Sequence, residues 1–304
     1  MSAPNKNNLR HKILDQTTSV LFVLPVILGI LIFTLLPMFS SLYYSFTEYN
    51  TLISNQPQGF IGFQNYIDIF TIHWDRFGHS LGMTFVYALI SVPLNLILSF
   101  ALALPLAREI KGIKIYRTLI YAPVLIPMII SGFLWQDLTS STGHFNLILK
   151  SVGLPAYAFF NSAETAMPSF LLMGLFTLGG SMVLWIAQIK AIPDSMYEVA
   201  RIEGGKYSFV LFRVMIPMCT PMIFYNLVLS IVNSLQTYAS AIVVRNIYNS
   251  EALDFFVGQI YDKIVGAGDL GLGSALSWIL FVIIAVVSAL TFKLNKWVYY
   301  EEEN

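Results

Sequence analysis

The charged residues that could do chemistry in this chain gather in one polar stretch between two long apolar segments. Residues 197–217 read YEVARIEGGKYSFVLFRVMIP, and Asp194 lies just upstream. A loop with alternating carboxylates and cations is suited to salt bridges and hydrogen bonds with a soluble partner. Nothing else in the chain has the residues to supply energy or chemistry. The charged members of the stretch are Glu198, Arg201, Glu203, Lys206 and Arg213.

Residue types used by enzymes and metal sites are sparse elsewhere. The single cysteine, Cys219, excludes an internal disulfide and gives no metal cluster, and we expect a buried, inert thiol. The glycine-rich run 266–273 lacks the Gly-Lys-Ser/Thr ending that holds phosphates and Mg²⁺. The four histidines lack the spacing of metal ligands: His11, His73, His79 and His144. We therefore expect no catalytic residue, no metal site and no cofactor bound by this chain.

The composition indicates a membrane protein. Hydrophobic residues make up 56% of the 304 residues and charged residues only 11%, whereas soluble domains carry about 25% charged residues. A helix needs about 20 mainly apolar residues to cross the hydrocarbon core of a bilayer. We therefore expect an all-α membrane protein with six transmembrane helices, at 18–46, 80–107, 118–136, 165–189, 214–244 and 271–292.

The six segments contain no Asp, Glu, Lys, Arg or His. Proton relays, voltage sensors and ion pathways accept about 2.5–3.5 kcal/mol for each centrally placed charge, so the sequence disfavours a proton-coupled carrier. Sodium coupling is less excluded, because backbone carbonyls can bind Na⁺. Prolines inside the segments are expected to kink the helices rather than break them: Pro25, Pro93, Pro123 and Pro127.

The distribution of basic residues predicts the orientation. With the N-terminus in the cytoplasm, only four of the 17 Lys and Arg residues fall outside: Arg76, Lys150, Arg245 and Lys263. The positive-inside rule then places both termini and the 190–213 loop in the cytoplasm. The expected organisation, from the N-terminus, is a cytoplasmic tail at 1–17, a six-helix transmembrane domain at 18–298 with the polar loop at about 190–213, and an acidic tail at 299–304.

The polar loop has the signals of a short helix followed by a bend. Ser195 with Glu198 three residues later is a capping box, which predicts a helix start, and Gly204-Gly205 predicts its end. Ala200 and Gly204 lie four residues apart on one face, which permits close approach of another surface. The alternative is an interfacial helix resting on lipid headgroups, with Glu198 serving only as a cap.

The spacing of the loop resembles a family signature. E-V-A-x-x-x-G, nine residues and V-x-I-P resemble the E-A-A-x-x-x-G-x9-I-x-L-P pattern of ABC importer permeases. Val199 in place of Ala is a conservative departure, as are the aliphatic residues at 214 and 216. The matched positions are Glu198, Ala200, Gly204, Val214, Ile216 and Pro217.

Further segments resemble the carbohydrate-type branch of these permeases, the subunits similar to the larger maltose-system permease. F-I-G-F-Q-N-Y at 60–66 is similar to its G-L-x-N-Y loop, with Phe63 in place of Leu. The resemblance extends over nearly the whole chain, and the other segments that carry it are 21–50, 114–127, 191–198 and 274–280.

The resemblance implies a type I ABC importer permease fold in the bacterial cytoplasmic (inner) membrane. It also implies a second permease subunit, two cytoplasmic ATPase subunits that hold ATP and Mg²⁺, and an extracytoplasmic solute-binding protein, with a sugar as cargo, membrane lipid around the spans and no nucleic acid. By this resemblance residues 194–208 form the coupling helix that sits in a cleft of one ATPase, with Glu198 facing the ATPase and Gly204 setting the bend. The implied coupling residues are Glu198, Ala200, Gly204, Ile216 and Pro217.

Polar residues within the spans are the candidates for the cargo pathway. Asn226, Ser230 and Asn233 are spaced four and three apart, hence on one helical face. Amide and hydroxyl groups suit sugar hydroxyls, and Tyr225 could pack on a sugar ring. The alternative is ordinary hydrogen bonding between helices, which we favour for Asn95. The pathway candidates are Thr177, Ser181, Tyr225, Asn226, Ser230, Asn233 and Gln236.

Three other functions stay open at the level of sequence. The chain could be an ABC permease for a non-sugar solute, although a cationic cargo would favour acidic residues in the spans, which are absent. It could be a scaffold subunit without transport, in which case cargo would not stimulate ATP hydrolysis. A channel or secondary carrier would work alone without ATP, and the polar loop speaks against that class.

Overall fold

The computed structural model describes residues 21–202 and 204–298. The expected tails at 1–17 and 299–304 lie outside this range. Helices dominate the described residues, and the single small sheet among them pairs β1 (Thr47–Glu48) antiparallel to β2 (Gly59–Phe60). The expectation of a helical fold is therefore confirmed, and the chain divides into two units.

The first unit comprises residues up to Phe70 together with Lys263–Trp278. The buried Asn65 donates hydrogen bonds to the carbonyls of Ser45 (2.9 Å) and Thr47 (3.0 Å). The bond to Ser45 satisfies a carbonyl left free where a helix ends, and the bond to Thr47 fixes the start of β1. Its elements are the helix Leu21–Ser45, in which the π turn η1 (Leu31–Leu35) leads into α2 (Leu36–Ser45), then β1, β2, α3 (Gln64–Thr71) and the first turns of α16 (Leu270–Lys293).

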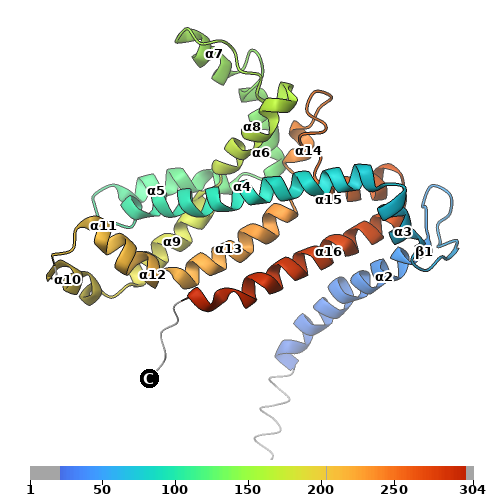
Figure 1. Ribbon diagram of the computed structural model, residues 1–304, viewed down its shortest axis with the longest axis horizontal. Helices are drawn as coiled ribbons and strands as arrows, with labels where there is room; N and C mark the ends of the chain where they lie inside the picture. The colour runs from blue at the N-terminus through green and yellow to red at the C-terminus, as the bar shows by residue number, and fades with distance from the viewer. Residues whose placement is uncertain (1–20, 203, 299–304) are drawn as a thin grey trace, which may run out of the picture. The chain divides into compact units, whose positions relative to one another are not determined.

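The second unit is built around α4 (Trp74–Leu106), which packs mainly against α9 (Gly179–Ala191) and α13 (Thr220–Leu235). Figure 1 shows α4 as a long helix with α9 and α13 beside it. The other elements are α5 (Ile113–Tyr121), η2 (Ala122–Leu125), α6 (Met128–Leu138), α7 (His144–Ser151), η3 (Phe159–Asn161), α8 (Ala163–Leu175), α10 (Asp194–Ile202), α11 (Tyr207–Val210), η4 (Leu211–Met215), α12 (Ile216–Met218), α14 (Ala241–Val244), α15 (Phe256–Tyr261) and η6 (Asn295–Trp297). The π turn η5 (Asp262–Gly266) starts at the last residue of the stretch Thr71–Asp262 in this unit, and its other residues belong to the first unit.

Three of the six expected spans are bent rather than continuous. The helices in the segment expected at 118–136 meet at 100°, those at 165–189 at 45° and those at 214–244 at 65°. Three other helices are long and apolar enough to cross a membrane without interruption. The described chain therefore holds three candidate spans, or up to six if each bent pair is one span. The fifth segment also ends earlier than expected, because α13 stops at Leu235.

The prolines account for part of this difference. Pro93 lies inside the uninterrupted α4, as expected. The expectation of a kink is wrong for Pro127. The residue before it, Ile126, is in extended conformation (ψ 124°), and the chain breaks there between η2 and α6. A proline disfavours helical backbone at the residue before it, so the helix ends there rather than bending gently.

A core cluster joins α4, α9 and the α10–α13 region. The fully buried Trp185 donates from its indole Nε1 to the Ser99 hydroxyl (2.9 Å), and its ring meets Phe100 edge-on. Cys219 is fully buried in the same cluster, which confirms the expected buried thiol. A second cluster includes Trp135, Phe170 and Phe255.

Gly179 allows α9 to cross close to α5, and this close approach gives a test of the fold. A Cβ at Gly179 would overlap the backbone oxygen of Ile120, whereas at Gly180 it would meet only Val124 at 3.7 Å. Overpacking costs about 1–3 kcal/mol, so Gly179→Ala should lower the thermal midpoint of the purified protein in detergent. The matched Gly180→Ala should stay within about 1 kcal/mol of wild type. Equal midpoints for the two variants would contradict the packing.

Candidate functional site

The polar loop forms helix α10, which begins at Asp194. The amide of Met196 bonds to the carbonyl of Pro193 (3.0 Å), so the helix starts directly after the proline. Ser195 therefore lies in the first turn, and its expected role as N-cap is wrong. Asp194 places a carboxylate in the first turn, where the free amides of a helix favour negative charge.

The end of α10 confirms the expected glycine stop. Gly204 has φ +74°, and the amide of Gly205 bonds to the carbonyl of Ala200 (2.9 Å). This is the longer bond of a Schellman motif, which closes a helix through a left-handed residue. A Cβ at Gly205 would lie 2.6 Å from the Ala200 oxygen and 2.7 Å from the ring of Phe209. Gly204 is therefore required for its left-handed backbone, and Gly205 for the close approach of its neighbours.

The faces of α10 differ in exposure. Ala200 is 3% exposed and belongs to the core cluster that also holds Val214. The surface that approaches Ala200 closely is therefore this chain's own bundle. Glu198 is exposed, as are Val199 at 55% and Ile202 at 85%. Ala200 fixes the helix to the bundle, and the opposite face is open to a partner.

An ion pair anchors the chain just before α10. Lys190, in the last turn of α9, lies 2.6 Å from the Glu109 carboxylate. The hydrogen bond and charge of Lys190 lower the pKa of the Glu109 carboxyl. Both groups are at the surface, where such a pair contributes little stability. Its effect is to hold the loop after α4 beside the start of the polar loop.

The last residues of the family-like signature lie where the backbone turns into α13. Ile216 and Pro217 are half-buried in α12. Pro217 cannot donate a helical hydrogen bond, and its carbonyl accepts one from the Thr220 hydroxyl (2.7 Å). Gln188 reaches across from α9 to the Met218 carbonyl (3.2 Å). These side chains support the 65° bend between α12 and α13.

A cavity of about 560 Å³ lies within the second unit. It is lined by residues of α4, the α8–α9 bend, α13 and the turn after α13, and none of its lining residues is charged. The described structure brings six of the seven predicted pathway residues together there. They are Thr177, Ser181, Asn226, Ser230, Asn233 and Gln236. Tyr225 does not line the cavity and is 50% exposed.

The sequence reasoning missed most of the α4 contribution. Tyr87, Ser91 and Asn95 recur every four residues and all line the cavity, so their spacing was a usable signal. Ser181 donates to the Asn95 side-chain oxygen (3.2 Å), which joins α9 to α4 at the cavity wall. Ser234 continues the four-residue spacing of Asn226 and Ser230 on α13 and was also missed. Other lining residues lacked a periodic signal because they lie in a turn or on another helix: Ser131, Thr237, Tyr238 and Ser240.

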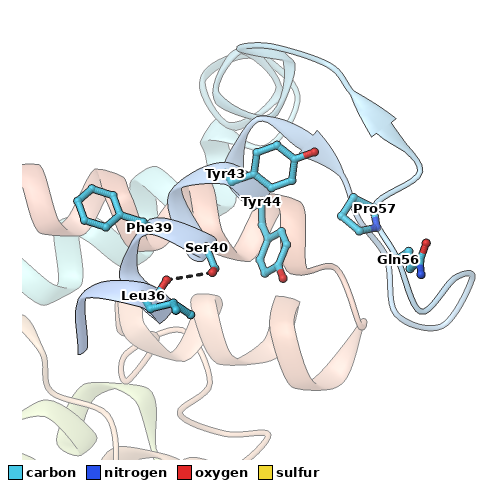
Figure 2. A pocket seen from close by; sticks show the side chains of 7 residues that line it. All are labelled: Leu36, Phe39, Ser40, Tyr43, Tyr44, Gln56 and Pro57. Carbon is cyan, nitrogen blue, oxygen red and sulfur yellow. Dashed lines mark hydrogen bonds between the residues drawn. The ribbon is translucent and has the colours of Figure 1, made fainter. Parts of the chain in front are cut away.

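A second hollow of about 680 Å³ lies on the first unit, along α2 and the loop before β2 (Figure 2). None of the predicted pathway residues belongs to it. The Ser40 hydroxyl in its wall already donates to the Leu36 carbonyl (2.9 Å). Its lining residues are Leu36, Phe39, Ser40, Tyr43, Tyr44, Gln56 and Pro57. Among residues 21–202 and 204–298, no group of three or more His, Cys, Asp or Glu is placed to hold a metal.

Comparison with known proteins decides the family. The chain is 30% identical over 295 residues to the probable ABC transporter permease protein YesP of Bacillus subtilis, covering 95% of this chain and 94% of that protein. The chain belongs to the ABC transporter permease family. It is also 26% identical to the trehalose/maltose transport system permease protein MalF of Thermococcus litoralis, over 95% of this chain and 98% of MalF. No protein-family model matches the chain.

Solved structures agree on the fold. A chain of a bacterial ABC transporter involved in the import of the acidic polysaccharide alginate superposes with a TM-score of 0.86. The match covers 96% of this permease and 100% of that chain, at 21% sequence identity. The permease therefore shares the fold of an ABC importer subunit.

The left-handed closure of α10 gives a test by proteolysis. A β-branched residue at positive φ is strained by about 1–2 kcal/mol, whereas Asn tolerates this conformation. Gly204→Val should therefore fray α10 and raise the rate of tryptic cleavage after Lys206 by about 5- to 30-fold, and Gly204→Asn should raise it much less. Equal cleavage rates for the two variants would show that the closure does not hold the loop.

Proposed function

We propose that this permease is one transmembrane subunit of a binding-protein-dependent ABC importer for a sugar or oligosaccharide. The observation that carries the proposal is the uncharged polar cavity, in a chain whose family moves solutes. Relatives named for their cargo support a sugar: a trehalose/maltose permease, a permease for starch degradation products and a permease for arabinooligosaccharides.

The lining of the cavity fits a neutral, hydroxylated solute. Asn233 and Ser230 can donate and accept hydrogen bonds, as sugar hydroxyls do. Tyr87 and Tyr238 add rings with an apolar face and a polar tip. The volume of about 560 Å³ lies within the ~300–1,000 Å³ of small-molecule sites. The partner permease would complete the pathway.

The proposed topology counts each bent helix pair as one span, which makes six. Broken helices are tolerated at membrane depth where they line a cavity or are buried in protein, and Ile126, Met128 and Thr177 at the breaks do line the cavity. The basic residues favour both termini in the cytoplasm. The membrane would be the bacterial cytoplasmic membrane.

The exposed face of α10 is the proposed docking surface for a cytoplasmic ATPase subunit, which would bind ATP and Mg²⁺ and carry out hydrolysis. Glu198, Val199 and Ile202 combine a carboxylate with two exposed apolar side chains. Closure of two ATPase subunits on ATP would shift the permease to its outward-facing state only if the closed ATPases bind that state more tightly than the inward-facing state. A solved relative of the same fold is described in complex with an alginate pentasaccharide-bound periplasmic protein, which supports a binding protein as a further partner.

Docking through α10 can be tested by one exposed substitution. Ile202→Asp should abolish co-purification of the ATPase subunit and cargo-stimulated ATP hydrolysis, because a carboxylate would be buried in the interface. Ile247→Asp is the matched control, since Ile247 is 82% exposed and Ile202 85%, and it lies on the proposed external side. Normal assembly and hydrolysis with Ile202→Asp would reduce α10 to a surface helix and refute the docking.

The cavity can be tested by comparing neighbours on α13. Asn233→Ala should lower oligosaccharide uptake by about 2- to 12-fold, the equivalent of one hydrogen bond worth about 0.5–1.5 kcal/mol. Tyr225→Ala, outside the cavity lining, should leave uptake near wild type. Uptake in proteoliposomes holding the complete complex is the measurement. The reverse order of effects would exclude this cavity as the pathway.

A further inference from the structure

A group of four charged residues lies within the second unit, next to the cavity. Arg245 is 3.0 Å from the Asp254 carboxylate and 3.9 Å from that of Asp262, and Arg76 is 3.6 Å from Asp262. We call these residues, two cations and two carboxylates, the charge quartet. The two terminal nitrogens of Arg245 contact different carboxylates, so its planar fork bridges them in a way that a lysine would not.

The central pair of the quartet, Arg245 with Asp254, is not an ordinary surface ion pair. The Asp254 side chain is only 9% exposed and that of Arg245 26%. Asp254 also accepts two hydrogen bonds from the buried Gln259, at 2.6 and 2.9 Å. Breaking such a pair by removing one partner is costly, because the other charge is left buried. The chain maintains this charge next to an otherwise uncharged cavity.

The segment Asp254–Tyr261 that the quartet holds also supports two walls of the cavity. The ring of Phe255 packs against Tyr87 at 5.3 Å, and the ring of Tyr261 packs against Tyr238 at 5.0 Å. Both Tyr87 and Tyr238 line the cavity. At Gly258, between these contacts, a Cβ would come within 4 Å of both Tyr238 and Arg245. Movement of the segment would therefore move both tyrosines.

The longer segment 245–262, which contains Asp254–Tyr261, is fastened along the first turns of α4. The amide of Phe256 donates to the buried Thr84 hydroxyl (2.9 Å), and the His79 ring contacts the Glu251 carbonyl (3.1 Å). Arg76 makes the third attachment through Asp262. These contacts recur at intervals along one helix, so the segment lies against α4 over more than two turns.

We infer that Arg245 is a positioning residue of the cargo pathway: with the rest of the charge quartet it holds segment 245–262 as a closed wall of the cavity, and cargo enters when this segment is released. The inference rests on the proposed function, which places the segment on the external side. In the closed arrangement Tyr87 and Tyr238 are fixed. Release of the quartet opens the cavity next to Ser240, the last of its lining residues along the chain.

A charge-neutral double variant removes the quartet's central pair without leaving a buried charge. Arg245→Gln with Asp254→Asn keeps similar side-chain volumes and hydrogen-bonding groups. Asp262→Asn is a milder second variant, because the Asp262 side chain is 43% exposed and its loss removes only the outer arm of the network.

The experiment measures thiol labelling of Ser240→Cys in intact cells with a membrane-impermeant maleimide. The only native cysteine is the fully buried Cys219, so it reports unfolding if it becomes labelled. Ile247→Cys is the control for access to the segment, because Ile247 is 82% exposed. Each substitution is placed in the wild-type chain, the double variant and Asp262→Asn.

We expect the double variant to raise the labelling rate of Ser240→Cys about tenfold over wild type, in the range of typical coupling effects. Labelling of Ile247→Cys should not change, and Cys219 should stay unlabelled. An unchanged labelling rate for Ser240→Cys would overturn the inference.

Two further outcomes are also decisive. If Cys219 becomes labelled in the double variant, that variant is unfolded and the milder Asp262→Asn is used instead. We then expect Asp262→Asn to raise the labelling rate of Ser240→Cys at least severalfold, and an unchanged rate would overturn the inference. Labelling of Ile247→Cys only in inside-out vesicles would refute the proposed orientation, and with it the external entry of cargo past this segment.

Discussion

The structure depends on the cost of leaving polar backbone groups unpaired in hydrocarbon. Continuous helices meet this constraint by themselves, but three of the apolar segments of this permease are bent by 45–100°. Two of the breaks, beside Ile126 and Thr177, lie against a cavity lined by amides and hydroxyls. The third, at Cys219, is buried in the core cluster, where Gln188 donates to the Met218 carbonyl. The same constraint explains why polar groups concentrate at the cavity: Asn95, Ser181 and Asn233 all line it.

The position of the polar loop depends instead on the packing of α10 and on the glycines that end this helix. Ala200 binds α10 to its own bundle, and the Gly204 closure with Gly205 ends the helix at a fixed point. The outward face that remains, including Glu198 and Ile202, is free to contact a partner. The proposed docking of an ATPase to α10 needs both properties, because a helix that slid on its own bundle would transmit no motion. Within the family signature, Ala200 and Val214 are buried and Glu198 is exposed.

The sequence was informative wherever a signal was local. The apolar segments, the helix end at Gly204 and the shared face of Asn226, Ser230 and Asn233 follow from length, backbone preference and the helical period. The break at Pro127 and the four-residue spacing that includes Tyr87 were also local signals, but they were missed. Tyr238 and Ser240 lie in a turn, so their place in the cavity depends on which elements meet and was not predictable. The charge quartet was beyond reach for the same reason, because Arg76 and Asp262 are far apart in the chain. Ser195 failed as a cap because Pro193 already starts the helix.

The central claim is that one face of α13 lines a water-filled cargo pathway. A cysteine scan of α13 with an impermeant maleimide, in the presence and absence of the transported oligosaccharide, tests it most directly. The account predicts that cysteines at 226, 230 and 233 react in the assembled transporter and are protected by cargo, whereas a cysteine at 225 is not protected. Reaction without this three-to-four-residue period, or no protection by cargo at 230 and 233, would contradict it.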